Sequence, residues 1–285
     1  MKIPDQLSHL RAEPGGVAWL AQLPELVRGC ADAWSLRVGE PYAYAFVSLA
    51  LRAELPDGTP VVLKIGFPHR ESEHESDALA HYDARGAVTL LQYDATRRAM
   101  LLERCEPGTS LLDHPDEEQA FRLAARVLDR LWRAPAPGHS FRPIAVDATR
   151  WLDELPERWE RLGRPFEREL LDEMISAFVD LPPTQGELVV CHQDFHRGNV
   201  LRAQREPWLA IDPKPVLAER EFDTAALIRD GDGDARWLEL LSSELGLDRE
   251  RMRRWALAHT LAWAFDESDP DQGDVDIVHR LHLAG

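Results

Sequence analysis

Residues 188–199, LVVCHQDFHRGN, join an apolar strand to a polar loop that carries Asp194 and, five residues later, Asn199. A second apolar segment, Trp208–Ile211, ends in Asp212. Both apolar strands are expected to be buried, and both are followed by carboxylate or amide groups. We therefore expect these polar groups to converge on a positive centre. An Asn–Asp pair supplies the hard oxygen ligands that Mg²⁺ prefers, and a free carboxylate can accept the proton of a hydroxyl. The pattern therefore favours phosphoryl transfer from a metal-bound phosphate chain to a hydroxyl acceptor.

The spacing His192-x-Asp194-x-x-x-x-Asn199 resembles the catalytic loop of the protein-kinase fold. Asp212 stands where kinases carry the Asp of the D-F-G motif, which binds a metal ion. This pattern of three residues also recurs by chance. The resemblance to kinases therefore depends on whether other positions of the chain match the kinase pattern as well.

A lysine and a glutamate in the N-terminal third of the chain supply that agreement. Lys64 lies in the apolar run Val61–Ile65, the context of the kinase lysine that contacts nucleotide phosphates. A helix is predicted over 70–82, and Glu75 shares its inward face with Ala78, Leu79 and Tyr82. Glu75 is therefore the expected partner of Lys64. The competing acids are Glu71, Glu73 and Asp77.

Periodicity predicts a strand-rich first part. A helix is expected to run through about Trp34, and residues 46–53 then alternate with period two. The turn residues Pro56, Asp57 and Gly58 connect this strand to a second one at 61–65. Beyond the helix at 70–82, two more strands are expected, at 88–92 and 99–103.

The remainder is predicted to be mainly helical, with two strand segments at 188–191 and 208–211. Helices are expected at 117–133, 150–162, 167–180, 235–245 and 249–266. The expected fold class is therefore α+β in two lobes, as in protein kinases. We place a small β-rich nucleotide-binding lobe at 1–104, and a larger helical lobe with the catalytic loop and acceptor site at 105–285.

Composition excludes several classes of partner and anchor. The 285 residues contain 50 acidic and 33 basic side chains, a formal net charge of −17, which disfavours nucleic acid or an anionic membrane as the main partner and permits a cationic ligand. Three widely spaced cysteines, at 30, 105 and 191, form neither a disulfide framework nor a metal motif. Without a signal peptide or an apolar run of about 18 residues, a cytoplasmic protein is expected.

The segments CHQDFHRGNV, at 191–200, and IDPKP, at 211–215, resemble the aminoglycoside phosphotransferases. More narrowly, with Val62–Lys64 and Arg85–Val88, they resemble the streptomycin kinase and hydroxyurea-resistance kinase group. The resemblance extends from about Leu36 to the C-terminus. It implies an enzyme that uses ATP and Mg²⁺ to phosphorylate a hydroxyl of a small, often cationic acceptor and so inactivates an antibiotic.

The resemblance also implies roles for individual residues. Asp194 would be the catalytic base, Asn199 and Asp212 the Mg²⁺ ligands, and Lys64 and Glu75 the pair that positions the phosphates. The adenine would lie against the main chain of the linker Glu103–Glu106, with Glu103 and Cys105 in the cofactor site.

The acceptor remains open at this stage. Streptomycin, another aminocyclitol, hydroxyurea, and an amino-sugar or amino-alcohol metabolite all fit a small cationic or polar hydroxyl compound. The acids expected to bind acceptor amines are Glu221, Asp223, Asp230 and Asp266. A monomer or simple homo-oligomer is expected.

Three departures from protein kinases are visible. Residues 39–46 contain one glycine where kinases carry a glycine-rich loop, and Gln193 stands where small-molecule kinases often have Gly. After Asp212, Pro-Lys-Pro replaces Phe-Gly and no A-P-E follows, which argues against a protein substrate.

A metallohydrolase is the rival interpretation from another class. His192, Asp194 and His196 alternate, so on an extended strand they would face one way, as metal ligands do. This hypothesis leaves Lys64 and Asn199 unexplained.

Overall fold

The computed structural model describes residues 3–43, 46–70, 72–267, 270 and 272–285, without the side chains of residues 266 and 267. Contacts divide the chain into two units. The first comprises Met1–Gly108 and Arg202–Leu209, and the second comprises Thr109–Leu201 and Ala210–Gly285. The return of 202–209 to the first unit was not expected from the sequence.

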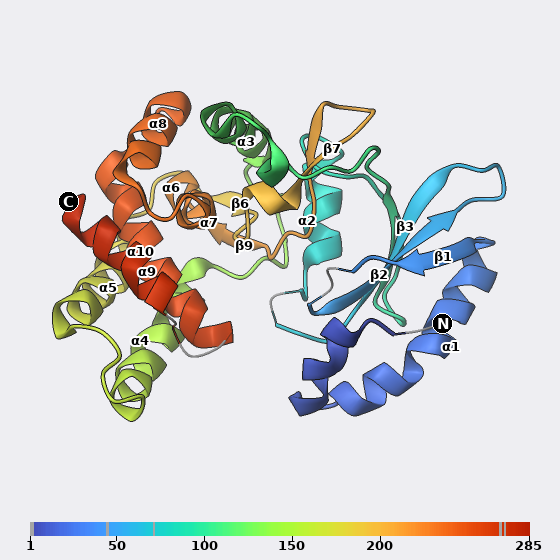
Figure 1. Ribbon diagram of the computed structural model, residues 1–285, viewed down its shortest axis with the longest axis horizontal. Coiled ribbons are helices and arrows are strands. Elements are labelled where there is room, and N and C mark those ends of the chain that lie inside the picture. Colours follow the sequence, from blue (N-terminus) through green and yellow to red (C-terminus); the bar gives the residue numbers. More distant parts are fainter. Residues whose placement is uncertain (1–2, 44–45, 71, 268–269, 271) are drawn as a thin grey trace. The chain divides into compact units, whose positions relative to one another are not determined.

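The first unit is built on a five-stranded antiparallel sheet in the order β1-β2-β3-β5-β4 (Figure 1). Its elements are η1 (Asp5–Ala12), α1 (Gly16–Trp34), β1 (Arg37–Pro41), β2 (Ser48–Glu54), β3 (Pro60–Gly66), α2 (Glu75–Tyr82), β4 (Leu90–Asp94) and β5 (Ala99–Glu103). In the central strand β3, Lys64 is paired with Ala50 of β2 and with Met100 of β5.

One face of this sheet is buried against α1. Strand alternation sends Val61, Leu63 and Ile65 to that face, where they share a core with Leu20 and Leu23 of α1. Because side chains alternate, Lys64 points to the opposite face. The hydrophobic pattern of β3 therefore fixes which side of the sheet receives the lysine.

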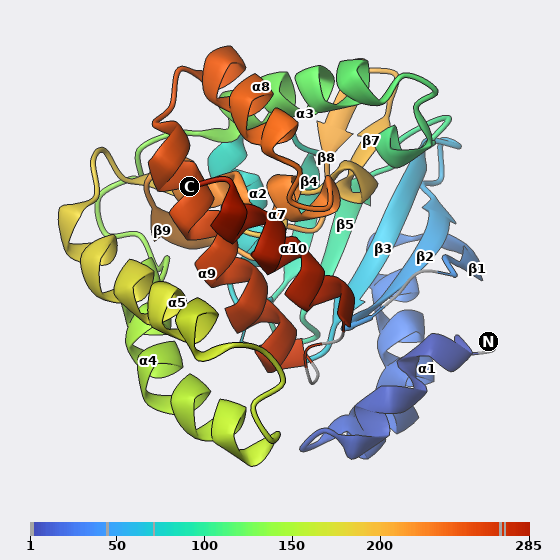
Figure 2. The same ribbon diagram turned by 60° about the vertical axis from the view of Figure 1, so that its left-hand side comes forward.

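The second unit is mainly helical. Its helices are η2 (Leu111–Asp113), α3 (Glu117–Leu131), α4 (Ile144–Arg161), α5 (Arg168–Asp180), η3 (Pro182–Thr184), η4 (Arg197–Asn199), α6 (Arg220–Asp223), α7 (Ala225–Asp230), α8 (Ala235–Leu245), α9 (Arg249–Glu267) and α10 (Gln272–Leu283). Helix α9 packs against α4, α5, α6, α7, α8 and α10, as Figure 2 shows for its neighbours α4, α5 and α10. Nearly every residue from Trp255 to Ala262 is buried, so α9 is the central helix of this unit.

Short strands connect this helical core to the catalytic segment. Strand β6 (Val189–Cys191) pairs antiparallel with β9 (Val216–Ala218). Strands β7 (Val200–Arg202) and β8 (Trp208–Ala210) form a second two-stranded sheet. The sequence predicted β6 and β8, which lie in apolar runs of four residues at 188–191 and 208–211. It missed β7 and β9, whose shorter apolar runs end at Arg202 and Glu219.

The predicted α+β class, with a β-rich first part and a mainly helical second part, is confirmed, with local differences. The helix predicted at 70–82 begins at Glu75, and the helix predicted at 150–162 begins at Ile144. Sequence analysis did not predict α10, whose buried residues Val275, Val278 and Leu281 recur every three residues.

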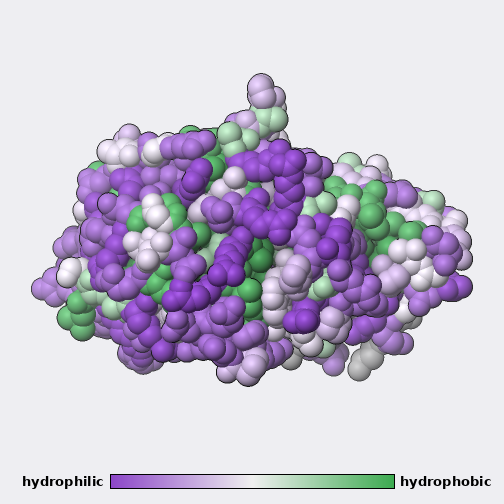
Figure 3. Space-filling model, turned by 90° about the horizontal axis from the view of Figure 1, so that it is seen from above, coloured by the Kyte–Doolittle hydropathy of each residue, from purple (hydrophilic) through white to green (hydrophobic). Residues whose placement is uncertain are grey.

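Hydrophilic side chains cover much of the face shown in Figure 3, with scattered apolar groups between them. This agrees with the 29% of residues that are charged. Among the described residues, no helix has the length and hydropathy needed to cross a membrane.

Replacing Leu51 by Ala should lower the free energy of unfolding by about 3 kcal/mol, because the side chain is completely buried between the sheet and α1. Urea denaturation measures the change. Val17→Ala is the control, since Val17 is 57% exposed and its truncation should change stability by less than about 0.5 kcal/mol. Equal effects of the two substitutions would contradict the placement of the core.

Candidate active site

A buried carboxylate holds the start of the catalytic loop. Asp223, at the end of α6, is fully buried. Its Oδ2 accepts the backbone N–H of His192 at 2.9 Å and its Oδ1 accepts that of Gln193 at 2.7 Å. Trp132 Nε1 donates to Oδ2 at 2.9 Å. Burial raises the pKa of Asp223 to about 6, although these three hydrogen bonds act to lower it.

The loop turns sharply at the residue that Asp223 holds. Gln193 has a φ of 66°, in the left-handed region that favours glycine, and the N–H of Asp194 donates to the carbonyl of His192 at 2.8 Å. Asp212 has a φ of 60°. Gln193 therefore adopts a conformation that favours glycine although it carries a side chain, and the Asp223 hydrogen bonds stabilise it.

The loop brings Asp194 and Asn199 together. The Asn199 side-chain amide donates to the Asp194 carbonyl at 3.0 Å and lies 3.4 Å from Asp194 Oδ2. Asp212 follows directly after Ile211, whose N–H donates to the Asn199 carbonyl at 2.9 Å. Lys214 connects the two carboxylates: its Nζ lies 3.0 Å from Asp212 Oδ1 and 3.8 Å from Asp194 Oδ2. The three residues predicted as base and metal ligands thus form one cluster.

A second buried ion pair holds the middle of the loop. Arg197 is buried, and both its backbone N–H and its Nε donate to Asp230 Oδ2, at 3.0 and 2.7 Å. Its guanidinium lies over the Phe121 ring, 4.4 Å from the centroid. Asp230 therefore positions the loop, which is a different contribution from the acceptor contact predicted for it.

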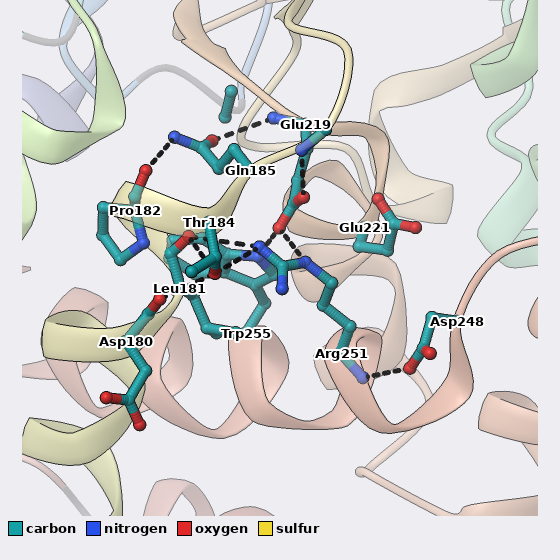
Figure 4. Close-up of polar contacts among 12 residues, drawn as sticks. Asp180, Leu181, Pro182, Thr184, Gln185, Glu219, Glu221, Asp248, Arg251 and Trp255 are labelled. Atoms are coloured by element: carbon teal, nitrogen blue, oxygen red, sulfur yellow. Dashed lines mark hydrogen bonds and ion pairs between the residues drawn. The ribbon is translucent and has the colours of Figure 1, made fainter.

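A third carboxylate network fixes the segment that leads to Asp223 (Figure 4). Glu219, at the end of β9, accepts hydrogen bonds from Arg251 Nε at 2.6 Å and Trp255 Nε1 at 2.5 Å. The N–H of Gly186 donates to its other oxygen at 3.2 Å. Because Arg251 and Trp255 belong to α9, the central helix anchors the β9–α6 junction.

The acids predicted to bind the acceptor occupy different environments. Glu221 lines a cavity of about 420 Å³ together with Glu187, Arg220 and Leu247, and this lining does not include Asp194. Asp223 is fully enclosed by its three donors, which favours a structural role over contact with an acceptor. The side chain of Asp266 lies outside the described residues.

In the first unit, Lys64 and Glu75 form the predicted ion pair. Lys64 Nζ donates to Glu75 Oε1 at 2.5 Å, and both side chains are buried. Glu75 is the first residue of α2, where a carboxylate is also favoured by the helix dipole. The competing acid Asp77 instead pairs with His74, while Glu71 lies outside the described residues.

The two linker residues predicted near the adenine have clear local roles. Burial acts to raise the pKa of Glu103, but hydrogen bonds from Arg205 and Thr89 outweigh it and lower that pKa. Arg205 reaches Glu103 from the segment 202–209, so this ion pair ties that segment to the first unit. Burial raises the pKa of the Cys105 thiol to about 12, which makes it an unreactive apolar side chain.

The donor set at the loop fits Mg²⁺. The Asn199 amide nitrogen faces Asp194, which leaves its amide oxygen for a metal ion. The Asp212 side chain is 34% exposed and offers a carboxylate. An amide oxygen and a carboxylate are the hard donors that Mg²⁺ takes in combination with substrate phosphates.

The metallohydrolase arrangement is not supported by the side-chain geometry. The buried His192 ring bonds through Nε2 to the Ile211 carbonyl at 2.9 Å, and Nδ1 of His196 accepts the N–H of Gly198 at 3.1 Å. Within the described parts of the chain, no three His, Cys, Asp or Glu side chains are grouped as metal ligands.

Fold and site together define a phosphotransferase with a protein-kinase-like architecture. Residues 34–268 match the aminoglycoside/hydroxyurea antibiotic resistance kinase family, and the chain belongs to this family. The predicted family and enzyme class are thereby confirmed.

Individual relatives agree with this assignment. Streptomycin 6-kinase of Streptomyces glaucescens is 35% identical over 280 residues, which cover 92% of this chain and 89% of the relative. Hydroxyurea phosphotransferase of Kitasatospora aureofaciens is 35% identical over 269 residues, covering 92% and 78%. A choline kinase structure from Streptococcus pneumoniae matches with a TM-score of 0.64 at 15% identity, covering 92% and 97%. This last likeness shows the fold.

Two cations beside Asp194 were not selected from the sequence. Lys214 entered the sequence analysis only as part of the IDPKP segment. The prolines on both sides of this lysine could have indicated that its backbone is held in one conformation. Arg229 of α7 places Nη2 3.8 Å from Asp194 Oδ1 and lies over the Trp263 ring. Because Arg229 is far from Asp194 in the sequence, no local pattern could predict that the two side chains lie close together.

Replacing Asp223 by Ala should lower the free energy of unfolding by about 3 kcal/mol, because it leaves buried N–H donors of the loop and of Trp132 without an acceptor. Urea denaturation provides the measurement. Asp153→Ala is the matched control on an exposed acid, expected to be nearly neutral. A stable Asp223→Ala protein with full turnover would contradict the anchoring role.

The buried His192 should make stability fall with acidification. Burial lowers the pKa of His192 to about 4 from an ordinary value of 6.5. As the pH falls from 6.5 towards 4, the unfolded chain therefore takes up a proton that the folded chain does not, which costs about 1.4 kcal/mol of stability per pH unit. Urea denaturation at pH 7, 6 and 5 should show a shallower decline for His192→Gln than for the wild type. Parallel curves would contradict this assignment.

Proposed function

We propose that this enzyme transfers the γ-phosphoryl group of ATP to a hydroxyl of a streptomycin-like aminoglycoside and thereby inactivates the antibiotic. The observation that carries the proposal is the cluster in which Asp194 lies beside Asn199 and shares Lys214 with Asp212. Membership of the resistance-kinase family and the 35% identity to a streptomycin 6-kinase over nearly the whole chain support the choice of acceptor.

The catalytic step follows from the position of Asp194. Its carboxylate orients the acceptor hydroxyl and accepts the proton as the oxygen attacks the γ-phosphorus. The loop that carries it is fixed at its start by the buried carboxylate of Asp223 and at its middle by the carboxylate of Asp230. The base is therefore held in position before the acceptor binds, which reduces the entropic part of the barrier.

The nucleotide is proposed to be held mainly by residues of the first unit. Lys64, oriented by Glu75, binds phosphate oxygens as a point charge, and the main chain around Glu103 and Cys105 meets the adenine. Asn199 and Asp212 would hold Mg²⁺, which neutralises charge on the transferring group when bound. The net charge of −17 leaves carboxylates free to attract a cationic acceptor, with Glu221 and Asp266 as proposed contributors.

Hydroxyurea is the second candidate acceptor. It is supported by the 35% identity to a hydroxyurea phosphotransferase. Other small cationic metabolites, such as amino sugars and amino alcohols, are the third arm of the test below.

An ADP-release assay with streptomycin, hydroxyurea, an amino sugar and choline as separate acceptors tests the proposal. Streptomycin should stimulate ADP release most, and Asp194→Asn should lower kcat by about 10³-fold, since a positioned base contributes 10²- to 10⁴-fold. Calorimetric titration with ATP should show binding in that variant close to wild type. Asp153→Asn is the control that replaces an exposed acid.

Two results would overturn the proposal. Undiminished turnover by Asp194→Asn would remove Asp194 as the base. Stimulation by hydroxyurea or a metabolite, with none by streptomycin, would reassign the acceptor while keeping the phosphotransferase.

A further inference from the structure

We propose that Lys214 is a positioning residue for phosphoryl transfer: its ammonium group holds the carboxylates of Asp194 and Asp212 at a fixed separation and limits how tightly the metal site binds a divalent cation. The inference rests on the proposed function, which makes Asp194 the base and Asp212 a metal ligand.

The backbone fixes where the Lys214 side chain begins. Its N–H donates to the His192 carbonyl at 2.9 Å, so residue 214 is bonded to the start of the catalytic loop. Prolines on both sides restrict φ at 213 and 215, and Pro215 favours extended backbone at residue 214. The backbone at Lys214 is therefore conformationally restricted and hydrogen-bonded to the loop that carries Asp194.

The side chain ends between the two functional carboxylates. Lys214 is 7% exposed, and its Nζ lies 3.0 Å from Asp212 Oδ1. The distance to Asp194 Oδ2 is 3.8 Å, where Asp194 itself is 16% exposed. A lysine that only neutralised surface charge would keep its ammonium group in water. Here the ammonium is enclosed and directed at both groups.

Lysine suits this position because its charge is compact and carries three donors. Two partly buried carboxylates close to one another repel, and each would move towards solvent without a cation between them. With Lys214 in place, Asp194 keeps the orientation it needs for the acceptor hydroxyl. Asp212 is likewise held in place by the ammonium.

The same charge must act against the metal. A cation in contact with Asp212 competes electrostatically with a divalent ion that uses this carboxylate. Removing Lys214 should therefore have two opposite effects: it strengthens divalent-cation binding and it slows catalysis. A residue that merely supported the fold would weaken both, so the pair of measurements separates the two roles.

Arg229 provides a matched control. It lies on the other side of the base, with Nη2 3.8 Å from Asp194 Oδ1, and its guanidinium packs over Trp263. Both cations face Asp194, but the contact with Asp212 belongs to Lys214. Neutralising Arg229 should therefore affect the base without changing metal binding.

The test combines kinetics with a direct measurement of metal binding. Lys214→Met, Lys214→Arg and Arg229→Met are compared with the wild type by circular dichroism, by ADP release, and by Mn²⁺ binding followed by electron paramagnetic resonance. Mn²⁺ is titrated with a non-hydrolysable ATP analogue present and no acceptor, so this readout needs no turnover.

We expect Lys214→Met to bind Mn²⁺ about tenfold more tightly and to lose about 10²-fold in kcat, with KM values changed less than about threefold. Arg229→Met should leave the Mn²⁺ affinity within about twofold of wild type. Lys214→Arg should keep the wild-type Mn²⁺ affinity, because the positive charge remains. Its kcat should fall about tenfold, because the planar guanidinium group fits poorly between two carboxylates.

Unchanged or weaker Mn²⁺ binding in a folded Lys214→Met protein would overturn the inference, as would wild-type kcat in that variant. If Lys214→Met does not fold, wild-type kcat in Lys214→Arg overturns it. Failure of the proposed acceptor is seen separately, as absence of stimulated ADP release by the wild type, and leaves the Mn²⁺ comparison intact.

Discussion

The active site depends on one buried interaction, the acceptance by Asp223 of two consecutive backbone N–H groups, those of His192 and Gln193. These bonds stabilise a left-handed residue immediately before Asp194, and so determine where this proposed base points. Burial disfavours the ionised form of Asp223, while its three hydrogen bonds favour it. Such a carboxylate is costly to bury and is retained because it orients the loop.

Further contacts within the second unit hold the segment that carries Asp223 and the loop that Asp223 orients. Helix α9 contributes Arg251 and Trp255 to the network of Glu219, and Glu219 precedes the short helix that ends in Asp223. A parallel contact, from Asp230 to Arg197, fixes the far part of the loop. Two buried acids, Glu219 and Asp223, and the half-buried Asp230 therefore have structural roles in a chain whose charge is −17. Part of the acidic excess positions the catalytic loop and is not available to an acceptor.

Sequence reasoning recovered the parts that short-range patterns encode. The apolar run at 61–65 singled out Lys64, and the helical phase of Ala78 and Leu79 selected Glu75 as its partner. It could not distinguish Asp223 and Asp230 from acceptor ligands, because their burial arises from packing against segments about 30 residues away. Arg229 was missed for the same reason. Strands β7 and β9 were missed because their apolar runs are shorter than those that contain β6 and β8.

The most direct test of the account is to follow the label from [γ-³²P]ATP in the presence of Mg²⁺ and streptomycin. We expect the label to move to streptomycin in the wild type, and this transfer to be lost in Asp194→Asn. Label that remains in ATP, or that passes only to inorganic phosphate at the same rate with and without streptomycin, would contradict it.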